Sequence, residues 1–490
     1  MRFAMVAVLL LAVTPASFSE ERLADDPGVT EALRLVETWV EGQRTYEGIP
    51  GISAAVVHDQ ELIWEHGFGV TDRERGTRAT PGTIYSICSI SKLFTSVAVM
   101  QLRDHEQLAL SDPVSEHLPW FNLRQAHPEG PPITLWGLLT HSSGLPRESD
   151  YPYWNLPDFP FPTREEMKAR LGEQETLYPA SKYFQYSNLG LSLLGEVVAE
   201  VSGQSFGEYV QRQILAPLDL ADTRPELPEF ERGKRMATGY GAKARDGSRA
   251  EVPFFQALGI APAAGFSSTV RDLAKFASWQ FRLLESGDDE VLAANTLREM
   301  HRVQWLDPDW ETARGLGFGV YRVNDTTFVG HGGSCPGFRS TLRLQTDKRI
   351  AVIFMANSSG VAPEAWAGRT YQIMAPAIAE ALESKDDGES TESVEDTEPE
   401  IDFERYAGNY SLAPWGGEMA VIPWKGSLAV VYLPTDDPLE ALAKLRHVED
   451  HTFRRVRDDD ALGEEIVFEI DAEGRSVALR RHSLSWPRVD

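Results

Sequence analysis

The sequence predicts an α+β protein in which an antiparallel sheet is flanked by helices and followed by a small antiparallel β domain. Helical patterns occur near both ends of the first 383 residues, and strand-like runs are grouped beside each of them. This grouping differs from the regular alternation of strands and helices that builds a parallel sheet. After residue 401 only short strand-like runs and turns remain, which is typical of a small antiparallel barrel or sandwich.

The first segment is an apolar run over residues 3–13 that follows Arg2. The run is about half as long as the ~20 residues that span a membrane, and Ser17 and Ser19 fit a cleavage site of small residues. We therefore expect a signal peptide over residues 1–19 and a secreted or periplasmic protein. An uncleaved anchor or a buried helix is the alternative.

The large region expected over residues 20–383 contains both helical and strand periodicities. Apolar residues that recur every three or four positions predict helices over 29–46, 91–105, 189–201, 206–214 and 362–383. Runs rich in β-branched and aromatic residues predict a hairpin of 52–57 with 62–69, and consecutive strands over 326–331, 340–345 and 350–355.

An acidic segment follows this region. Between Ser384 and Glu400 the chain holds eight acidic residues and one lysine, with Val394 as its single aliphatic residue. Such a segment cannot bury a core, so we expect a linker over residues 384–401 and a separate domain over 402–490. Strands of that domain are predicted over 406–412, 419–423, 428–433, 452–457, 466–471 and 477–482.

Charge and cysteine content restrict the function classes. The 47 Lys and Arg residues against 74 Asp and Glu residues give a formal charge of −27, which repels nucleic acid and anionic membranes. After the first apolar run, no segment is long and apolar enough to span a membrane. Cys88 and Cys335 are too few for a disulfide scaffold or a cysteine-based zinc cluster, but they could form one bridge. We expect a small-molecule or peptide substrate and no cofactor.

The first chemical motif is Ser89-Ile-Ser-Lys92, at the start of a helical pattern. One helical turn brings both side chains to one face. A serine hydroxyl becomes a strong nucleophile only when a base removes its proton, and a lysine amine serves as that base when desolvation or neighbouring positive groups lower its pKa. A surface helix start is the alternative interpretation.

Two further motifs carry polar side chains next to predicted elements. Tyr186 and Asn188 precede a helix, and a tyrosine near a lysine can carry phenolate character and act as a general base. A packed aromatic residue and a helix N-cap are the alternatives. His331 and Gly333 lie in a glycine-rich strand, where period-two alternation places them on one side together with Cys335. A lone histidine is more often structural than catalytic.

Together these motifs resemble the serine β-lactamase-related hydrolases, which include class C β-lactamases, penicillin-binding proteins, esterases and D-aminopeptidases. Ser89-Ile-Ser-Lys92 is similar to the S-x-x-K motif, Tyr186-Ser-Asn188 to Y-x-N, and His331-Gly-Gly333 to the H-x-G form of the third motif. The segment over 133–146 resembles L-L-x-H-x-S-G-L. The resemblance covers about residues 29–383 and implies an all-helical subdomain beside the sheet.

The resemblance implies a role for each motif residue. Ser89 would be acylated, Lys92 and Tyr186 would share the acid and base work, and Asn188 would contact substrate or Lys92. His331 and Gly333 would belong to the substrate-binding strand, where His331 polarises substrate. The backbone N–H groups of Ser89 and Ser334 would form the oxyanion hole. The segment over 140–144 would support the site.

Three further features of the sequence refine the function that the resemblance implies. Class C β-lactamases usually carry lysine where this chain has His331, so an efficient β-lactamase is not expected. Cys88 and Cys335 match the relative positions of an active-site disulfide in carbapenem-hydrolysing class A β-lactamases, so we expect this bridge, with two reduced cysteines as the alternative. Tyr406-Ala-Gly-Asn-Tyr410 resembles the opening of lipocalin-like domains appended to this family.

Three functions are compatible with the sequence. The first is a secreted serine hydrolase that forms a Ser89 acyl-enzyme on a peptide amide, including one with a D-residue, or on a small ester. The second is a penicillin-binding or weakly β-lactam-hydrolysing protein that acts as a sensor or cell-wall peptidase. The third is an inactive interaction protein, which the intact set of Ser89, Lys92, Tyr186 and Asn188 argues against.

Overall fold

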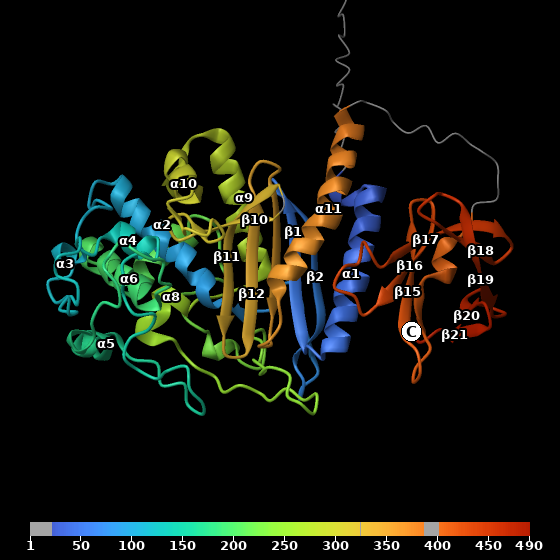
Figure 1. Cartoon of the computed structure of the whole chain (residues 1–490), viewed down its shortest axis with the longest axis horizontal. Coiled ribbons are helices and arrows are strands. Elements are labelled where there is room, and N and C mark those ends of the chain that lie inside the picture. Colours follow the sequence, from blue (N-terminus) through green and yellow to red (C-terminus); the bar gives the residue numbers. More distant parts are fainter. Residues whose placement is uncertain (1–21, 324, 387–400) are drawn as a thin grey trace, which may run out of the picture.

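The structure is a computed structural model that describes residues 22–323, 325–386 and 401–490. A nine-stranded sheet with helices on both faces forms its larger part, and an eight-stranded sheet forms the C-terminal part (Figure 1). The predicted signal peptide and most of the predicted acidic linker lie outside the described residues. Within the described ranges, no helix is long and apolar enough to cross a membrane.

The large sheet joins strands from both ends of its region. Its order is β3-β2-β1-β13-β12-β11-β10-β9-β8, and all neighbours are antiparallel. The strands are β1 (Gly51–His58), β2 (Glu61–Asp72), β3 (Thr77–Arg78), β8 (Trp305–Leu306), β9 (Ala313–Arg314), β10 (Gly319–Val323), β11 (Thr326–Cys335), β12 (Phe338–Gln345) and β13 (Ile350–Ala356). Because Ile52 on β1 lies opposite Ala356 on β13, the early hairpin and the late strands form one sheet, and the predicted fold class is confirmed.

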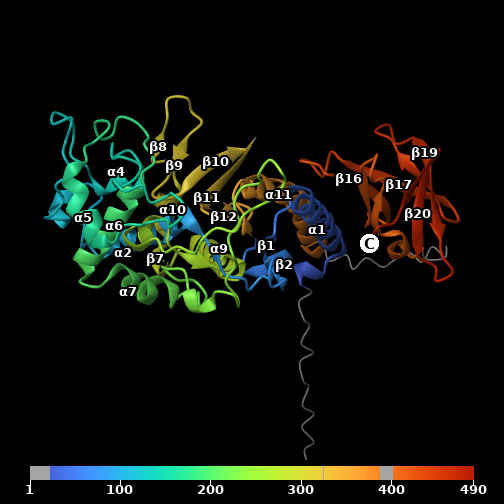
Figure 2. The ribbon, with the colours of Figure 1, turned by 90° about the horizontal axis from the view of Figure 1, so that it is seen from below.

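Helices cover both faces of this sheet. On one face, α1 (Pro27–Glu47) packs with α11 (Pro363–Asp386), and the two helices lie together in Figure 2. α9 (Val270–Ser286) packs on β1 and β13, while α2 (Ser91–Asp104) packs against α6 (Asn188–Ser202) and α8 (Ala261–Ala264). The remaining helices are α3 (Val114–His117), α4 (Leu135–Leu139), α5 (Arg164–Arg170), α7 (Phe206–Val210) and α10 (Ala294–His301).

Local sequence signals set the ends of the long helices. The Asp26 side chain accepts a hydrogen bond from the N–H of Val29 at the start of α1, and Gly48 ends that helix with a φ of 63°. α11 continues to Asp386, so the helix includes the first residues of the predicted linker.

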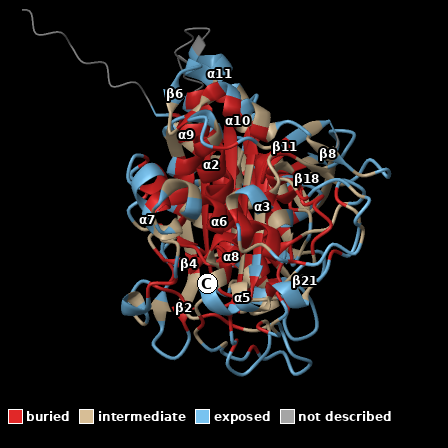
Figure 3. Cartoon of the chain, turned by 90° about the vertical axis from the view of Figure 1, so that its left-hand side faces the viewer, coloured by how far each residue is buried: buried red, intermediate tan, exposed pale blue. Residues whose placement is uncertain are grey.

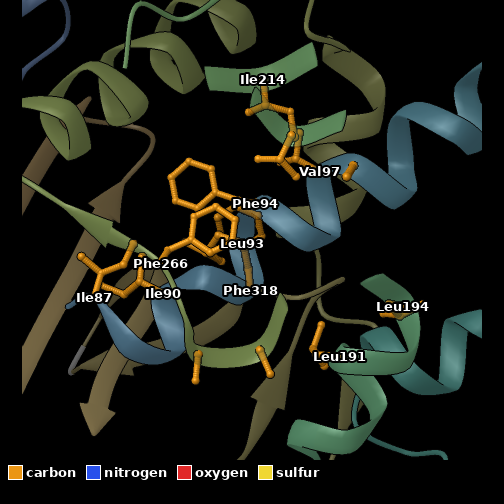
Figure 4. Close-up of a cluster of buried hydrophobic side chains, with 14 of the residues drawn as sticks. Ile87, Ile90, Leu93, Phe94, Val97, Leu191, Leu194, Ile214, Phe266 and Phe318 are labelled. Carbon is orange, nitrogen blue, oxygen red and sulfur yellow. The ribbon is translucent and has the colours of Figure 1, made fainter. Parts of the chain in front are cut away.

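The main core lies between the large sheet and the helical part. Figure 3 shows buried residues concentrated in α2, α6 and the strands behind them. Phe94 of α2 stacks on Phe266, with ring centroids 5.2 Å apart, in the cluster shown in Figure 4. This cluster also contains Ile87 and Ile90, so apolar packing fixes the chain on both sides of Ser89.

The C-terminal part is a near-closed antiparallel barrel, consistent with the lipocalin-like resemblance. Its strands pair in sequence order: β14 (Gly408–Ser411), β15 (Glu418–Trp424), β16 (Ser427–Leu433), β17 (Leu442–Glu449), β18 (Thr452–Val456), β19 (Leu462–Ile470), β20 (Ser476–Arg481) and β21 (Leu484–Pro487). A bridge between Tyr410 and Arg488 brings the last residues back to β14.

Candidate active site

The predicted nucleophile Ser89 lies on a tight turn, η2 (Cys88–Ile90), directly before α2. Two short strands, β4 (Tyr85–Ser86) and β5 (Ser267–Ser268), hold the chain that leads into this turn. Ser91 closes the turn because its hydroxyl donates to the Cys88 carbonyl at 2.5 Å and accepts the N–H of Phe266 at 2.9 Å. Ser89 therefore sits at a fixed helix N-terminus, where developing negative charge is favoured.

Lys92 is completely buried one turn after Ser89, and its Nζ lies 3.3 Å from Ser89 Oγ. The same nitrogen donates to Asn188 Oδ1 and to the Ala263 carbonyl, each at 2.8 Å. Burial is the main cause that lowers the pKa of Lys92 well below its ordinary value. A neutral amine has two hydrogens and one lone pair, so the two carbonyl acceptors leave the lone pair for the hydroxyl of Ser89.

Tyr186 and Ser89 line the same cavity, and Lys92 Nζ lies 4.8 Å from the centre of the Tyr186 ring. Burial raises the pKa of Tyr186 to about 12, although the nearby Ser89 side chain and the charge of Arg147 act on this pKa in the opposite direction. The resting side chain is therefore a phenol rather than the phenolate considered from the sequence. Between these two groups, Lys92, whose pKa is lowered, is the better base for Ser89 once it is uncharged.

A loop after α4 fixes the Tyr186 motif from behind. Ser187, not Asn188, is the N-cap of α6, because its side chain accepts the N–H of Gly190. His141 Nδ1 accepts the N–H of Ser187 at 3.1 Å, and its ring lies 4.4 Å from that of Tyr186. The predicted supporting segment over 140–144 thus contacts the motif directly.

β11 presents the third motif. β10 pairs with β11 only as far as Gly330, so residues 331–335 pair with β12 alone among the described strands. His331 Nδ1 lies 2.6 Å from the Gly332 carbonyl, and burial lowers the pKa of His331 to about 3. Since that carbonyl can only accept, the hydrogen is on Nδ1 and Nε2 is left as an acceptor in a neutral ring. The side chain therefore supplies no positive charge near neutral pH.

Gly333 allows β11 to approach the turn that carries Ser89. A Cβ at this position would lie 2.3 Å from the Ile87 carbonyl oxygen and 2.1 Å from Ser340 Oγ. Next to it, Cys88 and Cys335 form a disulfide in the structure. The bridge joins the residue before Ser89 to the residue after Ser334, the two expected oxyanion-hole positions.

The structure brings these residues to one cavity of about 350 Å³. Predicted residues that line it are Ser89, Tyr186, His331, Gly333 and Ser334, while Lys92 and Asn188 lie behind this wall. Residues that line it without having been singled out in the sequence are Arg147, Tyr321, Gly332, Thr341, Arg343 and Glu364.

The charged residues that line the cavity but were not predicted lie in parts of the chain without a recognised motif. Arg343 stacks on Tyr321, with its Cζ 5.7 Å from the ring centre, and forms no ion pair within the described part of the chain. Arg147 follows directly after the segment over 133–146, which was the one signal that could have pointed to it. Its guanidinium lies 4.9 Å from the centre of the Tyr186 ring.

Comparison with known proteins shows which family the chain belongs to. A family model described as Beta-lactamase matches residues 36–373. The chain belongs to the beta-lactamase family. Within this family, it is 26% identical over 363 residues to "Beta-lactamase-like protein 2" of Dictyostelium discoideum, covering 73% of this chain and 65% of that protein. The chain thus spans less than two thirds of this curated relative.

Solved structures of beta-lactamase-like fold are also similar to the chain. The octameric penicillin-binding protein homologue from Pyrococcus abyssi has a TM-score of 0.61 at 25% identity, and the match covers 93% of this chain and 99% of that one. A D-stereospecific amidohydrolase from Streptomyces sp. has a TM-score of 0.55 at 23% identity over 71% of this chain and 97% of that one. Because the first match covers most of the chain, the similarity extends into the C-terminal barrel region.

Proposed function

We propose that this beta-lactamase family member is a secreted serine hydrolase that cleaves a peptide amide, including one with a D-residue, or a small ester through an acyl-enzyme on Ser89. The observation that carries this proposal is the environment of Lys92. When the amine is uncharged, two carbonyl acceptors hold its hydrogens and leave its lone pair for the hydroxyl of Ser89, whose Oγ lies 3.3 Å away.

The expected mechanism follows from this geometry. Lys92 takes the proton of Ser89 while Ser89 Oγ attacks the substrate carbonyl carbon. The N–H groups of Ser89 and Ser334 stabilise the oxyanion of the tetrahedral intermediate. Tyr186, whose ring lies beside Lys92, gives its phenol proton to the leaving amine or alkoxide and regains a proton from the protonated Lys92. Water then attacks the acyl-enzyme, and the same groups return the proton to Ser89.

The chemistry of the third motif favours a substrate N–H over a carboxylate at the position of His331. Neutral His331 offers an acceptor nitrogen, which suits a substrate N–H and not the carboxylate that a lysine would bind. The similar structure from Streptomyces is that of a D-stereospecific amidohydrolase, which supports an amide with a D-residue as substrate. The apolar N-terminal run and the Cys88–Cys335 disulfide support an oxidising compartment outside the cytoplasm.

Fluorophosphonate labelling tests the nucleophile. The wild-type protein is expected to gain one adduct on Ser89 by mass spectrometry, and Ser89→Ala is expected to gain none. Turnover of D-Ala p-nitroanilide and p-nitrophenyl esters tests hydrolysis. Failure of the wild type to label would exclude a Ser89 hydrolase, whereas a single burst of product without turnover would indicate a penicillin-binding protein that deacylates slowly.

A further inference from the structure

A carboxylate that belongs to none of the recognised motifs lies directly behind the site. Glu148, on the loop between α4 and α5, accepts a hydrogen bond from Asn188 Nδ2 on Oε1 at 2.8 Å. Its Oε2 accepts the hydroxyl hydrogen of Tyr153 in a short contact, and Arg147 Nε lies 3.1 Å from Oε1. The Glu148 side chain is 22% exposed and does not line the catalytic cavity.

Glu148 decides which end of the Asn188 amide faces Lys92. A carboxylate only accepts hydrogen bonds, so it binds the amide NH₂ of Asn188 and leaves Oδ1 for Lys92. If the amide were reversed, Nδ2 would point at Lys92 and compete with Ser89 for the amine lone pair. The orientation of Asn188 thus controls whether the lone pair of Lys92 is available to the nucleophile.

We propose that Glu148 is a positioning residue that acts through Asn188 to hold Lys92 as the base for Ser89. The inference rests on the proposed function, because it assumes that Lys92 activates Ser89. In this assignment Glu148 contacts neither the substrate nor Ser89. Its loss would therefore change the rate of acylation and the pH dependence of that rate, and not the binding of substrate.

The charges around Lys92 determine the sign of the pH effect. Arg147 and Glu148 from the loop act on its pKa in opposite directions, with Glu148 raising it and Arg147 lowering it. The other titratable groups near it are His141 and His331, both held neutral by burial, and the Tyr186 phenol. Removal of the Glu148 charge therefore lowers the pKa of Lys92 further, and the amine stays neutral at lower pH.

The test measures the rate of Ser89 labelling by a fluorophosphonate as a function of pH. Glu148→Gln keeps the size of the side chain but can donate as well as accept, so it no longer selects one orientation of Asn188. We expect its maximal rate to fall about tenfold to a hundredfold, the range produced by loss of one hydrogen bond to a charged group. We also expect the acidic limb of its pH profile to move to lower pH.

Asp150→Asn is the matched control, because Asp150 lies on the same loop and pairs with Arg170 instead. It removes the same charge and is expected to keep the wild-type rate and profile. Melting temperatures of all three proteins separate positioning from misfolding.

The proposal would be overturned if Glu148→Gln kept the wild-type labelling rate and pH profile. It would also be overturned if Asp150→Asn lost the same rate, or if the rate loss in Glu148→Gln came only with a large drop in melting temperature. If the wild type itself does not label, the proposed function fails instead. The two failures are thus distinguishable.

Discussion

At the scale of single residues, Lys92 has to be neutral to remove the Ser89 proton, yet it is an amine with a high ordinary pKa. Burial lowers that pKa, and once the amine is uncharged, Asn188 and Ala263 accept its two hydrogens. Below its folded pKa the amine is protonated and has no lone pair. Acylation of Ser89 should therefore rise with pH and level off at a pH below the ordinary pKa of lysine.

Lys92→Arg tests this assignment, because a guanidinium stays charged at every working pH. We expect the rate of fluorophosphonate labelling to fall by about 10²- to 10⁴-fold, which is the usual contribution of a general base. Labelling rates are measured between pH 5 and 10. A variant that keeps the wild-type rate and acidic limb would show that another group activates Ser89.

Buried histidines predict how stability depends on pH. Burial lowers the pKa values of His301 and His331 to about 3 and that of His141 well below its ordinary value. In the unfolded chain these side chains bind protons below about pH 6.5, while the folded protein does not. The unfolded state then holds more protons, so stability is full above pH 6.5 and is lost as the pH falls from there towards 3.

His301→Gln tests this loss of stability at low pH, at a position that lies outside the catalytic cavity. His301 Nε2 contacts Gln280 Oε1 at 3.0 Å, and a glutamine amide can donate to the same oxygen without titrating. The melting temperature of the variant should fall less steeply between pH 7 and 5 than that of the wild type. An equal or steeper fall would show that buried His301 does not contribute to the pH dependence.

At the scale of elements, sequence patterns predicted segments whose periodicity agrees with their packing. α1, α2, α6 and α11 were predicted because apolar residues recur every three or four positions, and the early hairpin because its two runs are rich in β-branched and aromatic residues. β17 was missed, since Leu442-Ala-Lys-Leu-Arg favours a helix by intrinsic propensity, and only pairing with β16 makes it a strand. β21 was also missed, because its last residue is Pro487 and proline is unfavourable inside a strand. The strand forms by pairing with β20.

The same distinction holds for the site. Ser89, Lys92, Tyr186 and His331 belong to short motifs, and the combined resemblance of these motifs to a known family selected them. Glu148 and Arg343 contact residues that lie in other segments of the sequence, so their position depends on the assembled sheet and loop. No local pattern in a single sequence could have selected them.

The disulfide joins two elements that carry the expected oxyanion donors. Cys88 precedes Ser89 on η2, and Cys335 follows Ser334 at the end of β11, 247 positions later in the sequence. Exchange of both cysteines for serine should lower the free energy of unfolding by about 2–4 kcal/mol. It should also slow fluorophosphonate labelling, because the two N–H groups lose a covalent constraint.

Melting curves and labelling rates of the double variant measure both effects. Treatment of the wild type with reductant should reproduce them, and reductant should leave the double variant unchanged. If the double variant keeps the wild-type labelling rate, the packing of Gly333 against Ile87 alone holds the two donors in place.

At the scale of the whole molecule, the barrel is part of the packing of the larger region. Along β15 and β16, alternate side chains face the barrel interior and a core shared with α1. Met419 and Val421 point inward, whereas Ile422 and Leu433 join the shared core. Trp39 Nε1 on α1 donates to the Thr435 carbonyl at 2.8 Å. The barrel therefore docks on α1, and no residue of 401–490 lines the described catalytic cavity.

This docking predicts that barrel and catalytic region unfold together. Leu433 is buried against Gly42, where an added Cβ would lie 2.9 Å from Leu433 Cδ2. Leu433→Ala should lower the free energy of unfolding by about 2–5 kcal/mol through the cavity it leaves. Because the cavity around Ser89 lies elsewhere, the labelling rate at 25 °C and its pH profile should stay as in the wild type.

Scanning calorimetry of the full chain decides between docking and tethering. Leu479→Ala is the matched control, because Leu479 is buried inside the barrel and outside the shared core. If the two parts are coupled, both variants shift one common transition to lower temperature, and labelling by fluorophosphonate is lost in that same transition. The alternative outcome is two separate transitions. If labelling is lost in a transition whose temperature is the same in both variants and the wild type, the barrel is held only by its linker.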